Sequence, residues 1–133
     1  MEETTTKLKK VLLAEDDQFI SRAYKDGLER AGFEIVTALD GLIAVEKAKT
    51  EKPDIVLLDL MMPEKNGFEV LEEIKKEESS KNIPVIILSN LGQDSDIKKG
   101  KELGAIDYLI KSNVPMKDVI EKVKFYLEQT SGQ

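Results

Sequence analysis

The sequence predicts an α/β fold, a doubly wound sheet of five parallel strands with five helices on its two faces. Five short apolar runs, mostly β-branched residues or Leu, are typical of buried strands and too short for helices. They lie at residues 11–14, 35–38, 55–58, 85–88 and 108–110. Helical patterns separate the runs, and a β–α alternation implies a parallel sheet with right-handed crossovers. At 133 residues and 41% hydrophobic composition, the chain fits one domain with one core.

The first two helices are predicted from apolar residues that recur on one helical face. In the first helix these residues are Ile20, Ala23, Tyr24, Gly27, Leu28 and Ala31. Gly32 supplies a stop before the second strand. Leu42, Val45 and Ala48 mark the second helix, and Pro53 closes its connection to the third strand.

The last three helices differ in how many apolar residues they offer to a core. Asn66 is the expected N-cap of the third helix, whose apolar face is Phe68, Leu71 and Ile74. The fourth, residues 94–103, has few large apolar residues and should be the loosest. The fifth should start near Pro115 and end near Leu127. We expect disordered tails at residues 1–8 and 129–133 around a folded domain of residues 9–128.

Composition narrows the function. A net charge of -6, with a pI near 4.8, disfavours direct binding to nucleic acid, so proteins are the expected partners. The chain has no Cys and no His, which excludes thiolate or His-ligated metal sites and a histidine base. The N-terminus is polar and no apolar run is long enough for a membrane span, which favours a cytoplasmic protein without a membrane partner.

Polar side chains follow four of the predicted strands at the points where these strands end. Glu15 and Asp16 follow the first strand, Asp59 the third, Ser89 the fourth and Lys111 the fifth. The carboxyl ends of parallel strands meet at one edge, where ligands bind in open α/β sheets. Crowded carboxylates cost energy unless a cation lies among them, so the sequence predicts a divalent-metal site around Asp59.

These features, in this order and spacing, resemble the receiver domain of two-component response regulators. The resemblance covers nearly the whole chain. It also rests on residues flanking the strand ends, namely Pro63, Gly67, Gly104, Ala105 and Tyr108. It implies a flavodoxin-like sheet of strand order 2-1-3-4-5. A receiver is a phosphoacceptor signalling domain that catalyses at most its own phosphorylation and dephosphorylation, so no conventional enzyme activity is expected.

The resemblance also implies roles for individual residues. Asp59 is the expected phosphorylation site, and Lys111 and Ser89 would stabilise the phosphoryl group. Mg²⁺, for which Mn²⁺ is expected to substitute, would be held by oxygens of four residues. These are Asp16, Asp59, the Met61 carbonyl and, through water, Glu15. Ser89 and Tyr108 would form the switch, with the Tyr108 ring filling space that opens when the Ser89 loop moves inward. A plain strand aromatic is the alternative reading of Tyr108.

The implied partners are a sensor histidine kinase or histidine phosphotransfer protein as phosphodonor, and a downstream protein target. The domain should be a monomer or a weak phosphorylation-dependent dimer. The face of the fourth helix, fifth strand and fifth helix should carry the signal to the target, because no output domain is recognised after the fifth helix.

Three departures from the family pattern carry predictions of their own. Ser112 replaces the usual proline after Lys111, so the Lys111–Ser112 bond should be trans, because cis costs about 2.5 to 4 kcal/mol without proline. Asn90 replaces a small residue and should narrow access to the phosphoryl group. Met61 and Leu91 offer no group to orient an attacking water, so we expect a long-lived phosphoaspartate.

Other classes of function fit less well. An Asp-based phosphohydrolase would need a second aspartate where Met61 stands. A flavin binder would need a phosphate loop where Glu15, Asp16 and Asp17 would repel phosphate. Asp17 itself is the expected N-cap of the first helix. The main alternative is an interaction module that keeps the site but acts without phosphorylation.

Overall fold

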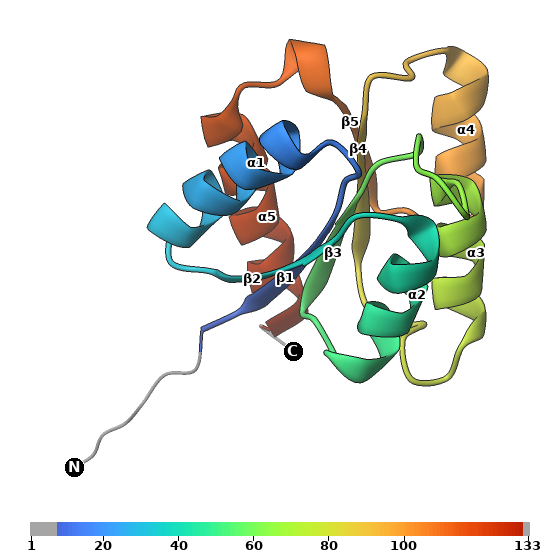
Figure 1. The fold of residues 1–133 in the computed structure, drawn as a ribbon, viewed down its shortest axis with the longest axis horizontal. Coiled ribbons are helices and arrows are strands. Elements are labelled where there is room, and N and C mark those ends of the chain that lie inside the picture. The colour runs from blue at the N-terminus through green and yellow to red at the C-terminus, as the bar shows by residue number, and fades with distance from the viewer. Residues whose placement is uncertain (1–7, 132–133) are drawn as a thin grey trace.

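The computed structural model describes residues 8–131, in which five strands alternate with five α-helices (Figure 1). The elements are β1 (Lys10–Ala14), α1 (Gln18–Arg30), β2 (Glu34–Ala38), α2 (Gly41–Thr50), β3 (Ile55–Leu58), α3 (Gly67–Lys76), β4 (Val85–Ser89), α4 (Asp94–Glu102), β5 (Asp107–Ile110), the 3₁₀ turn η1 (Lys111–Asn113) and α5 (Met116–Ser131). All strand pairs are parallel, in the order β2-β1-β3-β4-β5. The predicted fold and strand order are therefore confirmed.

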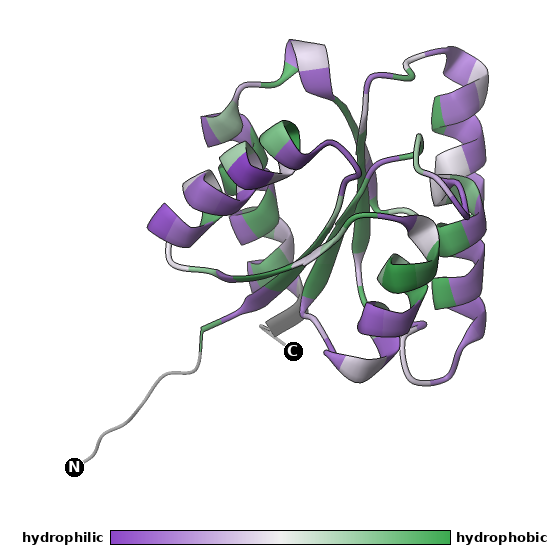
Figure 2. Cartoon of the chain, in the orientation of Figure 1, coloured by the Kyte–Doolittle hydropathy of each residue, from purple (hydrophilic) through white to green (hydrophobic). Residues whose placement is uncertain are grey.

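The sheet separates two hydrophobic clusters, because successive side chains of a strand point to opposite faces. Leu12 and Val56 face the cluster under α2, α3 and α4, whereas Val11 and Ile55 face the cluster under α1 and α5. Figure 2 shows the resulting pattern, with apolar strands in the middle and polar colour on the outer parts of the helices. Strand β3 is the middle strand of the sheet, and all four of its residues are buried. The end of β3 therefore lies at the centre of the sheet edge.

Side-chain caps fix where three helices begin. The Asp17 carboxylate accepts a hydrogen bond from the Ile20 amide at 3.0 Å, and Asn66 forms a reciprocal capping box with Glu69. Asp40 caps α2 in the same manner. The predicted N-cap roles of Asp17 and Asn66 are confirmed, and α1 starts at a fixed distance beyond the acidic residues that end β1.

Helix α4 differs from the other helices in its packing. It buries one residue, Gly100, and its N-cap Gln93 makes no side-chain cap hydrogen bond. A Cβ atom on Gly100 would lie 2.5 Å from Ile87 Cδ1, so the helix approaches β4 closely at one point. This limited burial agrees with the expectation that α4 is the loosest helix.

The C-terminal boundary differs from the sequence prediction. Helix α5 continues to Ser131, so residues 129–131 are helical rather than part of a tail. The prediction ended the helix at Leu127, its last buried residue, but each added helical residue gains a backbone hydrogen bond without needing burial. The predicted N-terminal tail, apart from its last residue, and the remaining C-terminal residues lie outside the described chain. No helix in residues 8–131 has the length and apolarity to cross a membrane.

The turn after β3 is set by a close approach at Gly67. The Gly67 amide donates to the Leu60 carbonyl at 2.9 Å, and a Cβ atom at Gly67 would lie 2.3 Å from the Asp59 carbonyl oxygen. A side chain there would push the backbone of Asp59 away from its position. Gly67 is therefore needed for space at the site.

We expect Gly67→Ala to lower the free energy of unfolding by roughly 2 kcal/mol or more, as overpacking against rigid backbone does. Gly27→Ala is the matched control, because its Cβ would meet only the flexible end of Met116, 2.9 Å away at Sδ. Denaturant unfolding measures both variants. Equal stability of the two would contradict the steric role of Gly67.

Candidate functional site

Three carboxylates meet at the carboxyl edge of the sheet. Glu15 and Asp16 follow β1, and Asp59 follows β3, which lies next to β1. One carboxylate oxygen of each lies within 4.8 Å of the others. Glu15 is 3% and Asp59 6% exposed, whereas Asp16 is open to solvent. The predicted acidic cluster is therefore present, with two members buried and one accessible.

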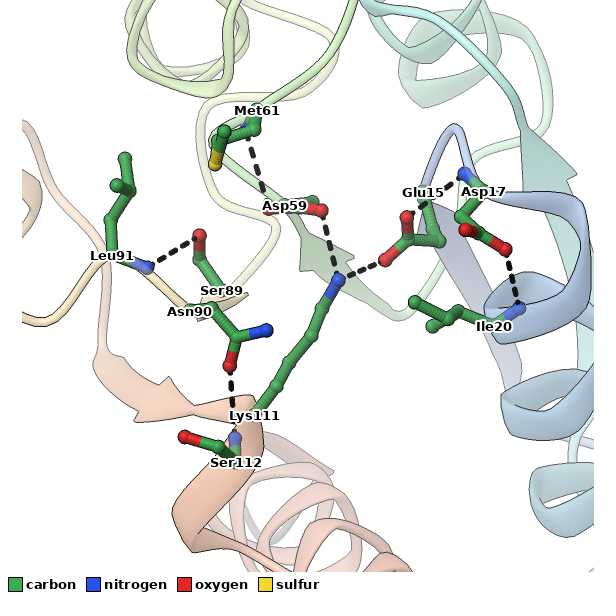
Figure 3. A network of polar contacts seen from close by, with 10 residues as sticks. All are labelled: Glu15, Asp17, Ile20, Asp59, Met61, Ser89, Asn90, Leu91, Lys111 and Ser112. Carbon is green, nitrogen blue, oxygen red and sulfur yellow. Dashed lines mark hydrogen bonds and ion pairs between the residues drawn. The ribbon is translucent and has the colours of Figure 1, made fainter.

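Lys111 lies between the two buried carboxylates (Figure 3). Its ammonium donates to Asp59 Oδ2 at 2.9 Å and pairs with Glu15 Oε1. Burial alone would lower the pKa of Lys111, but its hydrogen bonds to Glu15 and Asp59 and their charges outweigh burial, so this pKa is raised. The lysine therefore stays charged and offsets part of the crowding.

The three acids differ in how many hydrogen bonds their carboxylate oxygens accept. Glu15 Oε2 accepts from the Asp17 amide at 3.0 Å, so both oxygens of Glu15 are engaged. Asp59 Oδ1 accepts from the Met61 amide at 3.2 Å. The Asp16 carboxylate makes no hydrogen bond to a residue in the described range. Burial raises the pKa of Glu15 most, with the Lys111 and Asp17 hydrogen bonds opposing this.

This donor set fits Mg²⁺. The ion takes oxygen ligands and keeps several waters, so it needs only one or two carboxylates at an accessible site. Asp16 is exposed and uncommitted, and Asp59 lies beside it. Both oxygens of Glu15 and both of Asp59 already accept hydrogen bonds, so Asp16 is the acid that can coordinate the ion without giving up a contact within residues 8–131.

Ser89 and Tyr108 both hydrogen-bond to the backbone of Leu91. The fully buried Ser89 Oγ accepts from the Leu91 amide at 3.3 Å, and the Tyr108 hydroxyl donates to the Leu91 carbonyl. Burial, reinforced by the charges of Asp96 and Asp59, raises the pKa of Tyr108 to about 12. Tyr108 is 9% exposed, so this residue is largely buried.

The loop after Lys111 shows how the chain adapts to Ser112. The described residues contain no cis peptide bond, so the predicted trans Lys111–Ser112 bond is confirmed. The chain there forms η1, and the Ser112 amide donates to Asn90 Oδ1 at 3.0 Å. This hydrogen bond was not predicted from the sequence. The sequence does contain a signal for it, because Asn90 and Ser112 directly follow Ser89 and Lys111 at the ends of the neighbouring strands β4 and β5.

The fold and this arrangement of acids and lysine are those of a phosphoacceptor signalling domain rather than a conventional enzyme. Residues 11–124 match the family of response regulator receiver domains. The chain belongs to this family and to two-component signalling. The acidic residues Glu15, Asp16 and Asp59 form the pocket typical of the Mg²⁺ site in receivers.

Two curated relatives illustrate the similarity. The chain is 36% identical over 122 residues to the alkaline phosphatase synthesis transcriptional regulatory protein PhoP of Bacillus subtilis, covering 92% of this chain and 50% of that protein. It is 40% identical over 127 residues to a CpxR homolog of Haemophilus influenzae, covering 94% of this chain and 53% of that protein. The chain thus spans about half the length of these relatives.

Solved structures agree. The receiver domain of the Francisella response regulator 1452 superposes with a TM-score of 0.85 at 33% identity, covering 92% of this chain and 98% of that chain. A CheY-like receiver domain protein from Methanospirillum hungatei superposes with a TM-score of 0.88 at 26% identity, covering 95% and 98%.

The excess of negative charge at the site predicts that Mg²⁺ changes the stability of the protein. Without Mg²⁺, Asp16→Asn should be at least as stable as the wild type, because one of three repelling carboxylates is removed. With Mg²⁺ at ten times its Kd, the wild type should gain about 1.4 kcal/mol and Asp16→Asn much less. Thermal melts across an Mg²⁺ titration measure this.

Asp26→Asn, an exposed change on α1 outside the acidic pocket, is the charge-matched control and should keep the wild-type response to Mg²⁺. Melting temperatures that do not respond to Mg²⁺ in the wild type would refute the metal site.

Proposed function

We propose that this domain accepts a phosphoryl group on Asp59 from a phosphohistidine and passes the signal to a downstream protein. The phosphohistidine belongs to a sensor histidine kinase or a histidine phosphotransfer protein. One observation carries the proposal: a buried carboxylate at the end of β3 contacts Lys111 on one side and lies within 4.8 Å of two further acids. The shared membership of the receiver family supports it.

The transfer is an in-line displacement. An Asp59 carboxylate oxygen attacks phosphorus, the phosphorus–nitrogen bond of the phosphohistidine breaks, and the imidazole nitrogen keeps the electron pair. An acyl phosphate remains on Asp59. Lys111 neutralises charge on the phosphoryl oxygens, and the Ser89 hydroxyl donates a hydrogen bond to one of them. The Ser89 oxygen can still accept from the Leu91 amide while its proton turns to the phosphoryl group.

Mg²⁺, with Mn²⁺ as a substitute, supplies further neutralisation of the charge that the phosphoryl oxygens carry when it is bound. Asp16 and Asp59 would hold it directly, the Met61 carbonyl would complete the protein ligands, and Glu15 would act through a water. Lys111 would shift its contact from Glu15 towards the phosphoryl oxygens, since its ammonium is shared between two carboxylates and can exchange one partner for another.

The switch runs through the backbone of Leu91, whose amide bonds to Ser89 and whose carbonyl bonds to Tyr108. A new hydrogen bond from Ser89 to the phosphoryl group shifts the loop that Ser89 anchors, and Tyr108 follows because its hydroxyl is bonded to the Leu91 carbonyl. The Tyr108 ring lies beside Gly100 of the loosely packed α4, 3.3 Å from where its Cβ would be. Phosphorylation therefore changes the face formed by α4, β5 and α5.

That face has features of a protein-binding surface. Phe125 of α5 is 51% exposed beside a groove of about 500 Å³. Leu109 and Val114 also line the groove, together with acidic and basic side chains of α5. A downstream protein, or a second copy in a weak phosphorylation-dependent dimer, would bind here. A shift from a mostly inactive to a mostly active conformation needs roughly 5.5 kcal/mol of differential stabilisation. One neutral hydrogen bond supplies less than this, so the contacts of Ser89 and Lys111 with the phosphoryl group must act together.

The phosphorylated state should be long-lived. The domain should act in the cytoplasm, where the phosphodonor kinases act. The side chains of Met61 and Leu91 are apolar, and neither can orient a water for attack on the acyl phosphate.

Acetyl phosphate with Mg²⁺ should add one phosphoryl group per wild-type chain and none to Asp59→Ala, because Asp59 is the acceptor. Intact-protein mass spectrometry before and after strong base, which hydrolyses acyl phosphates, measures this. Asp54→Ala is the matched control, an aspartate at the opposite end of β3 that bonds to the Lys10 amide instead.

A label that persists in Asp59→Ala would place the acceptor elsewhere. An unmodified wild type would favour an interaction module that works without phosphorylation.

A further inference from the structure

One side-chain hydrogen bond ties together the two loops that carry Ser89 and Lys111. Asn90 Oδ1 accepts from the backbone amide of Ser112 at 3.0 Å (Figure 3). Asn90 directly follows Ser89, and Ser112 directly follows Lys111. The bond therefore connects the neighbours of two groups that flank Asp59.

The position of this bond follows from the sheet. Strands β4 and β5 pair in parallel until Ser89 and Ile110, their last residues. Beyond Ile110 the chain turns into η1, and the Asn90 side chain bridges to the amide of Ser112. The side-chain amide thus extends the connection between β4 and β5 past the end of their backbone ladder.

Other contacts between these segments stop short of Lys111. Tyr108 bonds to the Leu91 carbonyl, and a Cβ atom on Gly92 would lie 2.8 Å from Ile110 Cδ1. Both contacts act on β5 before η1 begins. Within residues 8–131, the Asn90–Ser112 hydrogen bond joins the Ser89 loop to the turn that contains Lys111.

We propose that Asn90 is a positioning residue that holds the Lys111 turn against the Ser89 loop and so keeps the ammonium in reach of Asp59. Ser112 takes part through its backbone N–H, which a proline at this position would lack. The inference rests on the proposed phosphorylation of Asp59. It adds that movement of the Ser89 loop on phosphorylation is transmitted to the turn after β5 as well as to Tyr108.

The test is a double-mutant cycle on the rate of phosphorylation by acetyl phosphate with saturating Mg²⁺. Ser112→Pro removes the donor, and Ser112→Ala removes the same hydroxyl while keeping the donor. With Asn90 present, the proline variant should react about threefold to tenfold more slowly than the alanine variant, the effect of losing one net hydrogen bond. In an Asn90→Ala background the ratio of the two should fall to near one.

Two further readouts separate positioning from general loss of structure. The Mg²⁺ concentration that gives half the maximal rise in melting temperature should be the same in Asn90→Ala and wild type, because Asn90 bonds to no proposed metal ligand. The Ser112 amide resonance should shift on phosphorylation of the wild type and shift much less in Asn90→Ala.

The outcomes are distinct. If the wild type is phosphorylated and the proline-to-alanine ratio is the same in both backgrounds, Asn90 does not position the turn and this inference is wrong. If the wild type does not accept a phosphoryl group at all, the proposed function and this inference both fail.

Discussion

The ammonium of Lys111, held between Glu15 and Asp59, is the interaction on which the site depends. Three acids share one buried positive charge, so the pocket keeps a negative excess that a divalent cation can neutralise. The same ammonium offsets part of the crowding of these acids, and in the proposed function it also contacts the phosphoryl group. Its raised pKa keeps it charged for both tasks.

The rest of the fold brings these charges together. Strands β1 and β3 are neighbours and almost entirely buried, so their ends are fixed by packing on both faces of the sheet. Gly67 lets the chain turn back directly behind Asp59, and Asp17 starts α1 two residues after Glu15. Strands β4 and β5 bring Ser89 and Lys111 from the other side, with loops joined through Leu91 and Asn90.

The spacing of apolar residues in the sequence predicted most of the fold and of the site. The apolar runs located every strand, and the rule that parallel strands end at one edge predicted that Glu15, Asp16, Asp59 and Lys111 lie together. The end of α5 was missed because Glu128 and Gln129 are exposed, whereas the helix continues to Ser131. The Asn90–Ser112 bond was also missed. This bond depends on the direction of one side chain in an irregular loop, which no sequence period encodes.

The free energy of unfolding of Lys111→Met, measured with and without Mg²⁺, tests the central role of this lysine most directly. Without Mg²⁺ the variant should lose about 3 kcal/mol, because two buried carboxylates lose their partner. Mg²⁺ should then restore more stability to the variant than it adds to the wild type. Lys122→Met is the control, because it breaks the ion pair between the exposed Lys122 and Asp107. Its free energy of unfolding should fall by less than about 1 kcal/mol. Equal stability of Lys111→Met and wild type without Mg²⁺ would contradict the account.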